Sequence, residues 1–574
     1  MQNTEVSRIL GEIADLLELK GGNDFRVRAY HNAQRAIEGL SEPLTKIHER
    51  GELDDIDGVG KSIAEKIREL LNTGRLAYYE ELKQEFPEGL MPMMDVNGMG
   101  PKKVKLVYEQ LGVSSIDELK QAAEAGQLAS LPGLGKKTEE KILKGIADLE
   151  KSQGRFTLKM ATATARDLLE RIRNVAGVEK AEAAGSLRRG KETVGDLDIL
   201  VATKNPSAAM EAFLATDSRK ETLWQGESKS SIVLNTGLQV DLRVVPRESF
   251  GAAMQYFTGS KAHNVKLRER AVARKLKVNE YGVFQEGEEQ PLAGQTEESV
   301  YEALGLVWIP PELREGLNEI DLAEQDNLPP LLEEKHIRGA LHNHTTDSDG
   351  RLNLEELVEE AKARGYHYLA VTDHSSTLSV ARGLDSARLR KQIEQIRSFN
   401  QKHPDFPVLA GSEVDIRTDG TLDFSDDDLA QLDFVIAAIH SQFNLSQADM
   451  TKRICSALAN PYVDLLAHPT GRLVARREGF AVDREALYQT AAETGTALEI
   501  NAQDMRLDLR DQHIREAKAY GIVFSINTDT HAASDFDHLA FGVGTARRAR
   551  LQKEDVINTW TLKQLQTWQR KRKG

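Results

Sequence analysis

The chain has 574 residues, enough for about four domains of ordinary size, and 40% of its residues are hydrophobic. It contains no apolar run of about 18 residues, which excludes a membrane-spanning helix, and its single Cys455 excludes an internal disulfide and favours a reducing cytoplasm. The formal net charge of −15 argues against a generally basic surface, so nucleic-acid binding would have to rest on backbone contacts and local features.

Three short segments of the N-terminal region share one plan, an apolar residue, then Gly-x-Gly, then a helix with basic residues. The glycine pairs are Gly58 and Gly60, Gly98 and Gly100, and Gly133 and Gly135. Glycines permit a tight turn with exposed backbone N–H groups at a helix N-terminus, which is a site for anions. Because the pairs recur at intervals of 40 and 35 residues, we expect helix-hairpin-helix elements that bind nucleic-acid phosphates without reading sequence.

The most informative motif lies in residues 185–200. Asp196 and Asp198 stand two residues apart on an apolar strand, so their side chains point to the same side of the sheet. Two neighbouring carboxylates favour a bound cation, and oxygen ligands suit Mg²⁺ or Mn²⁺. The turn before this strand offers backbone N–H groups, the Ser186 hydroxyl and Arg189 to phosphate oxygens.

Asp241 is the best candidate for a third carboxylate. It lies in the apolar run 238–245, which predicts a second buried strand that ends at Pro246. Three carboxylates can hold two metal ions, and metal ions beside a phosphate-binding turn are typical of phosphoryl or nucleotidyl transfer.

These segments resemble the palm of DNA polymerase family X, and Tyr256–Ser260, Asn264, Arg268 and residues 279–282 strengthen the resemblance. The resemblance implies that Tyr256 and Phe257 pack on the incoming sugar, that Asn264 contacts the minor-groove edge of the base pair, and that Arg268 supports the templating base. The nucleotide-binding residues implied in this way are Gly185, Ser186, Arg189, Gly195, Tyr256, Phe257, Gly259, Ser260, Lys261, Asn264 and Arg268.

Two positions depart from the family pattern. Lys261 stands where an acidic residue is expected, which suggests an added contact to the nucleotide. Gln239 stands where an arginine often lies near the primer end, which weakens the expectation of primer-side activation.

The helix after the first glycine pair resembles the lyase domain that begins many family X polymerases. The resemblance implies that Lys66 forms a Schiff base with an abasic sugar, which requires a lowered lysine pKa that the sequence does not reveal. The 5′-phosphate pocket would be lined by Arg26, Arg28, Tyr30 and Arg35, with a solvated helix face as the alternative.

The part of the chain after residue 338 predicts a parallel barrel, because seven apolar segments each precede a helical stretch. The segments lie near residues 339–341, 368–372, 408–412, 434–439, 463–467, 497–500 and 522–527. Metal-binding residue types stand at or just beyond six of these strand ends, where barrel active sites gather. They are His342, His344, Asp349, His374, Glu413, His440, His468, Asp529 and His531.

This pattern resembles a PHP (polymerase and histidinol phosphatase) domain. The resemblance implies a distorted seven-stranded barrel that holds up to three metal ions, with those nine residues as ligands and Glu413 bridging two ions. Mixed imidazole and carboxylate ligands suit Zn²⁺, Mn²⁺ or Fe²⁺.

The sequence therefore predicts a multidomain α+β and α/β protein that resembles a bacterial family X DNA polymerase with a C-terminal PHP domain. The expected parts are a lyase-like helical domain with a helix-hairpin-helix (1–88), fingers with two further repeats (89–150), a nucleotidyltransferase palm (151–245), a thumb (246–316), a linker (317–338) and the metal-dependent barrel (339–574).

The implied function is filling of short DNA gaps, in base excision repair or end joining, with a 3′–5′ exonuclease or 3′-end-processing activity in the barrel. The expected partners are gapped or primer–template DNA and deoxynucleoside triphosphates, for a monomer at the nucleoid in the cytoplasm with no membrane contact. Two alternatives keep the polymerase but make the barrel a phosphatase or an inactive scaffold.

Overall fold

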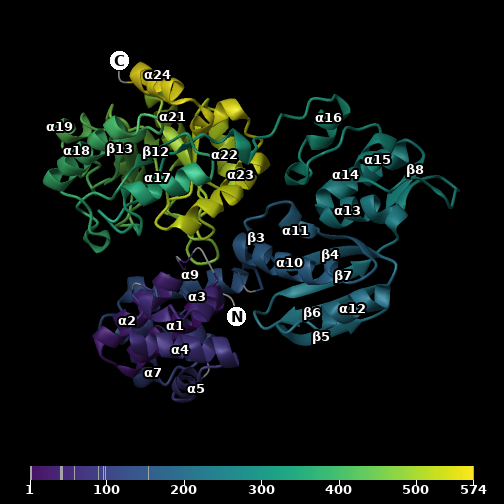
Figure 1. Ribbon diagram of the computed structural model, residues 1–574, viewed down its shortest axis with the longest axis horizontal. Coiled ribbons are helices and arrows are strands. Elements are labelled where there is room, and N and C mark those ends of the chain that lie inside the picture. Colours follow the sequence, from purple (N-terminus) through teal and green to yellow (C-terminus); the bar gives the residue numbers. More distant parts are fainter. Residues whose placement is uncertain are drawn as a thin grey trace. The chain divides into compact units, whose positions relative to one another are not determined.

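The computed structural model describes residues 3–38, 40, 43–56, 58–87, 89–94, 96, 98–152 and 154–572 (Figure 1). The chain divides into two compact units: residues 1–153 make up most of the first, and the greater part of residues 154–574 makes up the second. Across the described residues, no helix has both the length and the apolar character needed to span a membrane.

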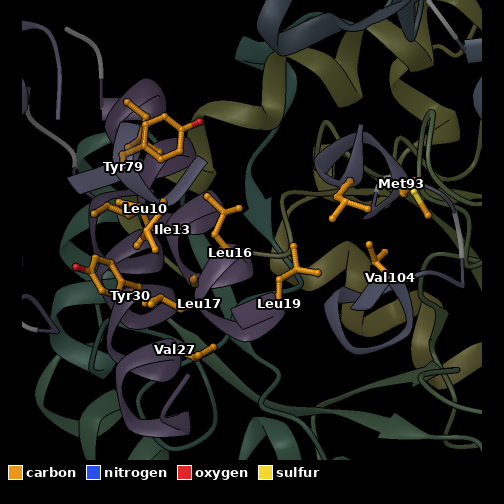
Figure 2. Packing of buried hydrophobic residues seen from close by; sticks show 14 of the residues in the cluster. Leu10, Ile13, Leu16, Leu17, Leu19, Val27, Tyr30, Tyr79, Met93 and Val104 are labelled. Atoms are coloured by element: carbon orange, nitrogen blue, oxygen red, sulfur yellow. The ribbon is translucent and has the colours of Figure 1, made fainter. Parts of the chain in front are cut away.

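The first unit is helical. Its helices are α1 (Asn3–Lys20), α2 (Asp24–Glu38), α3 (Leu44–Arg50), α4 (Lys61–Thr73), α5 (Ala77–Gln84), α6 (Leu90–Met94), α7 (Pro101–Leu111), α8 (Ile116–Glu124) and α9 (Lys136–Ser152), with short 3-10 turns at Leu53–Asp55 and Leu128–Ser130. Helix α1 places Leu10, Ile13 and Leu17 on one buried face, at the spacing of successive helical turns, and Figure 2 shows them packed near Tyr30 and Tyr79. One apolar core therefore holds these helices together.

The predicted glycine turns are present in this unit. The first glycine of each pair has positive φ, 84° at Gly58, 99° at Gly98 and 80° at Gly133, a conformation that other residues adopt at a cost. Helices α4, α7 and α9 each begin directly after the second glycine of a pair. The three turns that the sequence predicts, each followed by a helix, are therefore present in the structure.

The palm is a mixed five-stranded sheet in the order β2-β4-β7-β6-β5. Its strands are β2 (Val178–Ala183), β4 (Asp196–Thr203), β5 (Arg219–Gln225), β6 (Lys229–Leu234) and β7 (Gln239–Val244), and its helices are α10 (Leu158–Arg173), α11 (Gly185–Arg188) and α12 (Pro206–Leu214). A separate small sheet pairs β1 (Phe156–Thr157) with β3 (Thr193–Val194). Strands β4 and β7 are parallel neighbours, and this pairing brings the two predicted acidic strands together.

The thumb follows as helices and a three-stranded sheet. Its elements are α13 (Phe250–Thr258), α14 (Lys261–Ala273), β8 (Leu276–Asn279), β9 (Gly282–Gln285), β10 (Pro291–Ala293) and α15 (Glu297–Ala303). The segment expected to be a linker, residues 317–338, contains α16 (Glu319–Glu324), whose Ile320 and Ala323 are buried in the thumb core with Leu313. This segment therefore packs against the thumb.

The C-terminal region contains seven parallel strands in sequence order, as predicted. They are β11 (Gly339–Ala340), β12 (Tyr368–Val371), β13 (Val408–Asp415), β14 (Phe434–Ala438), β15 (Leu465–Leu466), β16 (Ala497–Asn501) and β17 (Phe524–Asn527). The helices are α17 (Leu354–Ala363), α18 (Ser386–Lys402), α19 (Asp426–Leu429), α20 (Gln447–Leu458), α21 (Arg484–Thr494), α22 (Asp511–Lys518), α23 (Leu539–Arg548) and α24 (Leu562–Arg572).

A buried asparagine connects the two edge strands of this sheet. The Asn558 amide donates to the carbonyls of Gly339 on β11 and Ile526 on β17, both at 2.9 Å, and its oxygen accepts from the Ile526 N–H at 2.7 Å. One side chain thereby satisfies edge groups that water would otherwise reach, and it completes a nearly closed barrel.

Candidate active sites

The palm carboxylates lie on adjacent parallel strands. Asp198 on β4 stands in register opposite Asp241 on β7, and Asp196 is exposed at the start of β4. Burial, together with the negative charges of Asp196 and Asp241, raises the pKa of Asp198 to about 6. A bound cation would relieve this repulsion, so the three carboxylates fit a divalent metal ion.

Two polar side chains hold Asp241. Lys229 lies 3.0 Å from one oxygen, and the Gln239 amide donates to the other at 3.1 Å. Burial alone would raise the pKa of Asp241, but hydrogen bonds from Ser231, Gln239 and Lys229 outweigh it and lower the pKa. Gln239, the departure from the family pattern, thus contacts a predicted metal ligand.

The turn that precedes β4 is shaped around Asp198. Gly185 has φ of +64°, and a Cβ there would lie 2.8 Å from an Asp198 carboxylate oxygen, so this position requires glycine. The Ala184 N–H donates to the Asp198 carbonyl at 2.8 Å. The half-buried Ser186 and Arg189 follow on this turn, beside the metal-type carboxylates.

The two arginines of this turn have different partners. Arg188 donates to both oxygens of Glu297, at 2.8 and 2.6 Å, whereas Arg189 places its Nε 3.1 Å from Glu315 and donates to the Thr258 carbonyl. Burial would raise the pKa of Glu297, but Arg188 and Arg314 outweigh it and lower the pKa to about 2. Glu297, which the sequence analysis missed, therefore fixes Arg188 as a structural residue.

The segment 255–268 supplies the other predicted nucleotide contacts. Ser260 caps α14 by accepting the His263 N–H at 3.2 Å, and Asn264 donates to the Tyr256 carbonyl at 2.8 Å. A Cβ on Gly259 would lie 3.3 Å from an Arg189 nitrogen, so this turn adjoins the phosphate-binding turn.

The remaining predicted nucleotide residues differ in exposure. Lys261 and Arg268 are exposed, Tyr256 and Phe257 are half-buried, and Gly195 lies just before β4.

Arg243 is a residue of the palm that the sequence analysis missed. Its guanidinium lies 4.6 Å from the centre of the Phe257 ring, and its positive charge acts on Asp198. Arg243 stands two residues after Asp241 on β7, so strand alternation places both side chains on one face. That spacing is the signal that would have found it.

In the first unit, Lys66 lies beside an aromatic residue that the sequence analysis also missed. The Lys66 ammonium is 5.1 Å from the centre of the Tyr78 ring and contacts the Ser62 hydroxyl and carbonyl at 3.1 and 3.2 Å. Arg26 donates to the Tyr78 hydroxyl at 2.9 Å, and Tyr30 stacks on Tyr78. Lys66, Arg26 and Tyr30 therefore gather around Tyr78.

The second glycine of each predicted DNA-binding turn has free space around it. A Cβ on Gly60, Gly100 or Gly135 would have no atom of the described residues within 4 Å. Neither internal packing nor a positive φ therefore requires glycine at these three positions. Close approach of another molecule to the backbone would explain why glycine stands at these positions.

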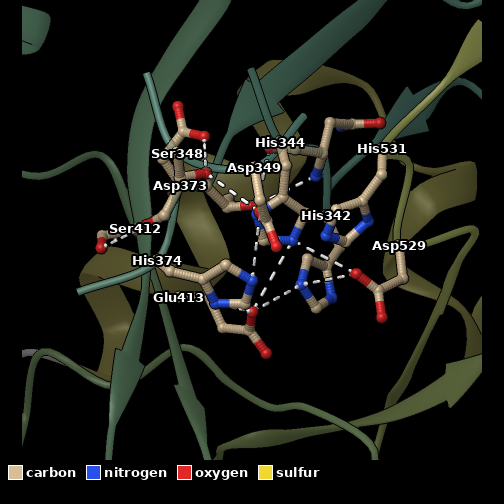
Figure 3. A network of polar contacts seen from close by, with 12 residues as sticks. His342, His344, Ser348, Asp349, Asp373, His374, Ser412, Glu413, Asp529 and His531 are labelled. Carbon is tan, nitrogen blue, oxygen red and sulfur yellow. Dashed lines mark hydrogen bonds and ion pairs between the residues drawn. The ribbon is translucent and has the colours of Figure 1, made fainter. Parts of the chain in front are cut away.

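In the barrel, Glu413 lies at the centre of a cluster of imidazoles. Its carboxylate oxygens lie 2.9 to 3.6 Å from ring nitrogens of five histidines, which are His342, His344, His374, His440 and His468. Figure 3 shows His342, His344, His374, Glu413 and Asp529 pointing toward one another. Strand β13 runs on to Asp415, so Glu413 lies inside the strand and not just beyond its end.

The barrel residues form three groups of metal-binding size. Within each group the ligand atoms lie within 4.8 Å of one another, a search made over the described part of the chain. The groups are His344, Asp349, His374 and His531; His342, His344 and Asp529; and His374, Glu413 and His440. Among these groups of described residues the palm carboxylates do not appear, so the barrel site is the more tightly gathered of the two.

The carboxylates around His342 favour positive charge at this site, as a bound cation would supply. Burial would lower the pKa of His342, but Asp529, Glu499 and Glu413 outweigh it and raise the pKa well above its usual value. The Nε2 atom of His342 and the Oε2 atom of Glu413 are buried and make no hydrogen bond. Metal coordination would satisfy both atoms, so the residues fit divalent metal ions.

Glu499 holds two of the predicted ligands, although the sequence analysis did not find it. Its carboxylate lies 2.7 Å from His342 Nδ1, accepts the His468 N–H at 2.7 Å and is fully buried on β16. A carboxylate behind a metal-binding imidazole fixes the ring's orientation and tautomer. The sequence signal for Glu499 is its position as a single acidic residue between Leu498 and Ile500 in an apolar strand.

Asp373 plays a comparable part near Asp349. It is buried and accepts hydrogen bonds from the Thr345 N–H at 2.8 Å and from Gln392 at 2.6 Å. It thereby anchors the loop that carries Asp349 toward His374, 3.5 Å away.

Comparison with known proteins agrees with this geometry. Four family models match the chain: a helix-hairpin-helix domain over residues 1–76, a SAM-like helix-hairpin-helix tandem over 91–148, a DNA polymerase beta thumb over 253–315 and a PHP domain over 340–503.

Three curated relatives are also similar. DNA polymerase/3′-5′ exonuclease PolX of Bacillus subtilis (strain 168) is 39% identical over 572 residues, 99% of each chain. DNA polymerase lambda of Rattus norvegicus is 25% identical over 51% of this chain and 53% of its own, and that of Arabidopsis thaliana is 25% identical over 54% and 62%. The chain therefore belongs to the bacterial family X DNA polymerases that carry a C-terminal PHP domain.

Proposed function

We propose that this protein is a DNA-directed DNA polymerase that fills short gaps during repair and carries a 3′–5′ exonuclease in its barrel. The observation that carries the proposal is the presence of two separate ligand sets in one chain. The palm offers three carboxylates beside a phosphate-binding turn, and the barrel offers a buried cluster of imidazoles around Glu413. The PolX relative, by its name, combines the same two activities.

In the palm, Asp196, Asp198 and Asp241 would hold Mg²⁺ or Mn²⁺. When bound, these ions lower the pKa of the primer 3′-hydroxyl and neutralise charge on the triphosphate. Ser186 and Arg189 grip phosphate oxygens, and Gly185 leaves room for Asp198 beside them. Extension of the primer releases pyrophosphate.

Residues of the thumb side position the nucleotide. Tyr256 and Phe257 stack in an edge-to-face pair, with ring centres 5.1 Å apart, and present half-buried rings to the sugar. Asn264, fixed through the Tyr256 carbonyl and Gln255, reads the minor-groove edge. Lys261 and Arg268, exposed on α14, reach the nucleotide and the templating base.

In the barrel, the nine gathered residues would hold up to three ions of Zn²⁺, Mn²⁺ or Fe²⁺, which activate water for hydrolysis of a phosphodiester. Glu413 lies 2.9 Å from His374, which belongs to two of the groups, and 3.3 Å from His440, so it is the candidate to be shared between two ions. Glu499 and Asp415 accept from the outer nitrogens of His342 and His440 and so orient both rings.

The first unit would bind duplex DNA on either side of the gap. The open space at Gly60, Gly100 and Gly135 lets phosphates approach the N-termini of helices α4, α7 and α9, a contact that reads no sequence. Lys66, beside Tyr78 and Arg26, is the candidate nucleophile for removal of a 5′ abasic sugar. A monomer located with the nucleoid in the cytoplasm completes the proposal.

The test is a gapped duplex labelled at its 3′ or its 5′ end and incubated with Mn²⁺, with and without deoxynucleoside triphosphates. Templated filling with nucleotides and 3′-shortening without them support both activities. Filling without shortening makes the barrel a phosphatase or a scaffold, which a nitrophenyl phosphate assay then separates. Absence of filling with either Mg²⁺ or Mn²⁺ overturns the polymerase assignment.

A further inference from the structure

An arginine of the barrel reaches the phosphate-binding turn of the palm. Arg548, the last residue of α23, has a side chain that is only 4% exposed. One of its nitrogens donates to Glu315 at 2.9 Å and to the Arg189 carbonyl at 2.8 Å. Its other terminal nitrogen pairs with Asp511 at 2.9 Å, and this ion pair holds the guanidinium to the barrel.

Glu315 connects this arginine to the predicted triphosphate contact. The same Glu315 oxygen that accepts from Arg548 lies 3.1 Å from Arg189 Nε, and Lys191 lies 3.9 Å from the other oxygen. Burial would raise the pKa of Glu315, but the charges of Arg548 and Lys191 outweigh it and keep the pKa below its usual value. A permanent carboxylate therefore shares its charge among three cations.

We propose that Arg548 is a positioning residue of the polymerase, which sets the affinity of Arg189 for the incoming nucleotide. The inference rests on the proposed role of the turn Gly185–Arg189 in binding the triphosphate. Arg548 draws negative charge of Glu315 away from the Arg189 guanidinium and holds the Arg189 carbonyl in place. Through it, the barrel contributes to nucleotide binding in the palm.

Removal of Arg548 has two consequences that act in the same direction. The Glu315 carboxylate would then be neutralised by Arg189 and Lys191 alone. It would interact more strongly with the Arg189 guanidinium and so compete with phosphate for it. The Arg189 carbonyl would also lose its donor, so the turn is held less well. Both effects weaken binding of the nucleotide in its ground state more than they slow chemistry at the metal ions.

The neighbouring Arg547 is a matched control. It pairs with Glu312 at 2.7 Å and donates to the Leu332 carbonyl at 2.9 Å. These contacts also join α23 to the segment around the thumb, but they involve neither Glu315 nor Arg189. Loss of Arg547 therefore perturbs the same helix but leaves the contacts of Glu315 with Arg189 in place.

The experiment compares the full-length wild type, R548Q, R548K and R547Q in single-nucleotide gap filling with Mg²⁺, and measures KM for the nucleotide and kcat separately. We expect R548Q to raise KM by about tenfold with kcat within about twofold of wild type, and R547Q to leave KM unchanged. R548K retains the charge but not the forked donors, so its KM should lie between the two.

A second arm tests whether Glu315 mediates the effect. In an E315Q background, R548Q should raise KM far less than in the wild type, because the charge that Arg548 redirects is gone. Equal KM changes in R547Q and R548Q, or an undiminished effect in E315Q, would overturn the inference. If R548Q does not fold, R548K decides, since unchanged KM in that variant also contradicts it; absence of gap filling by the wild type would contradict the proposed function instead.

Discussion

The thumb and the barrel each bury a glutamate, and the positive charges that neutralise it are of different kinds. Glu297 pairs with Arg188 and Arg314, both at 2.6 Å, whereas Glu413 lies among five imidazoles. Arginine keeps its charge at every accessible pH, so Glu297 is part of a permanent scaffold. An imidazole, unlike a guanidinium, can give up its proton and bind a metal ion, so metal ions can replace protons in the cluster around Glu413.

The two predicted metal sites differ in the same sense. In the barrel, the side chains of His342 and His344 are fully buried, and Glu499 holds the ring of His342. In the palm, Asp196 is exposed, and Asp198 is held beside Asp241 with a raised pKa. The candidate ligands of the barrel are thus buried and held by neighbouring side chains, while the palm site includes an exposed carboxylate.

The largest effect is expected for Asp198→Ala. Loss of this carboxylate removes the ligand that lies between Asp196 and Asp241, and gap filling should fall by about ten-thousandfold, or about 5 kcal/mol of transition-state stabilisation. The 3′-shortening activity of the same preparation should equal that of the wild type. Steady-state assays on one labelled gapped duplex measure both, and loss of both activities would refute two independent sites.

The reverse result is expected for His344→Ala. His344 belongs to two of the three ligand groups, so its loss should lower bound metal, and 3′-shortening should fall by about a thousandfold, or about 4 kcal/mol. Gap filling should remain within about twofold of the wild type. Metal content by mass spectrometry distinguishes loss of an ion from loss of a general base; a variant with full metal and full nuclease activity would contradict the assignment.

Glu297→Gln should affect stability more than chemistry. The buried Arg314 and the half-buried Arg188 would lose their shared counter-charge, which should lower the free energy of unfolding at pH 7 by about 3 kcal/mol. The pKa of Glu297 is lowered from 4.5 to about 2, so its contribution is complete above pH 4.5 and is lost as the pH falls toward 2.

Urea unfolding of the wild type and of Glu297→Gln at several pH values tests the direction of this pH dependence. The difference between wild type and variant should be constant above pH 4.5 and shrink below it. A difference that grows with acid would show that the glutamate is not held ionised by the arginines.

The sequence predicted what local pattern determines. Strand alternation predicts that Asp196 and Asp198 lie on one side of the sheet, and the repeated strand-and-helix pattern predicted the seven parallel strands that the structure contains. The glycine pairs predicted the turns because positive φ at their first position is a local requirement. Each of these patterns is a local requirement, so the sequence alone was enough to predict the elements that contain it.

Most of the missed residues act across long sequence separations, and Arg243, two residues from Asp241 on β7, is an exception. Glu499 meets His342, Glu297 meets Arg188, and Arg548 meets Glu315, and no local pattern links the members of these pairs. Asn558, which connects β11 to β17, acts through backbone groups that any sequence would offer. Such contacts depend on tertiary packing, so only the folded chain reveals them.

The smallest effect concerns the first unit, and a matched pair of variants can isolate it. Gly100 has φ of −105° and open space around its Cβ position, so Gly100→Ala should fold normally but block close approach of a phosphate. We expect a loss of about 1 kcal/mol in DNA binding, or about fivefold in affinity, by fluorescence anisotropy with a gapped duplex. Gly98 has φ of +99°, so Gly98→Ala should instead cost about 1 kcal/mol of stability. If Gly100→Ala bound DNA as tightly as the wild type, the free space at the second glycine would not mark a phosphate contact.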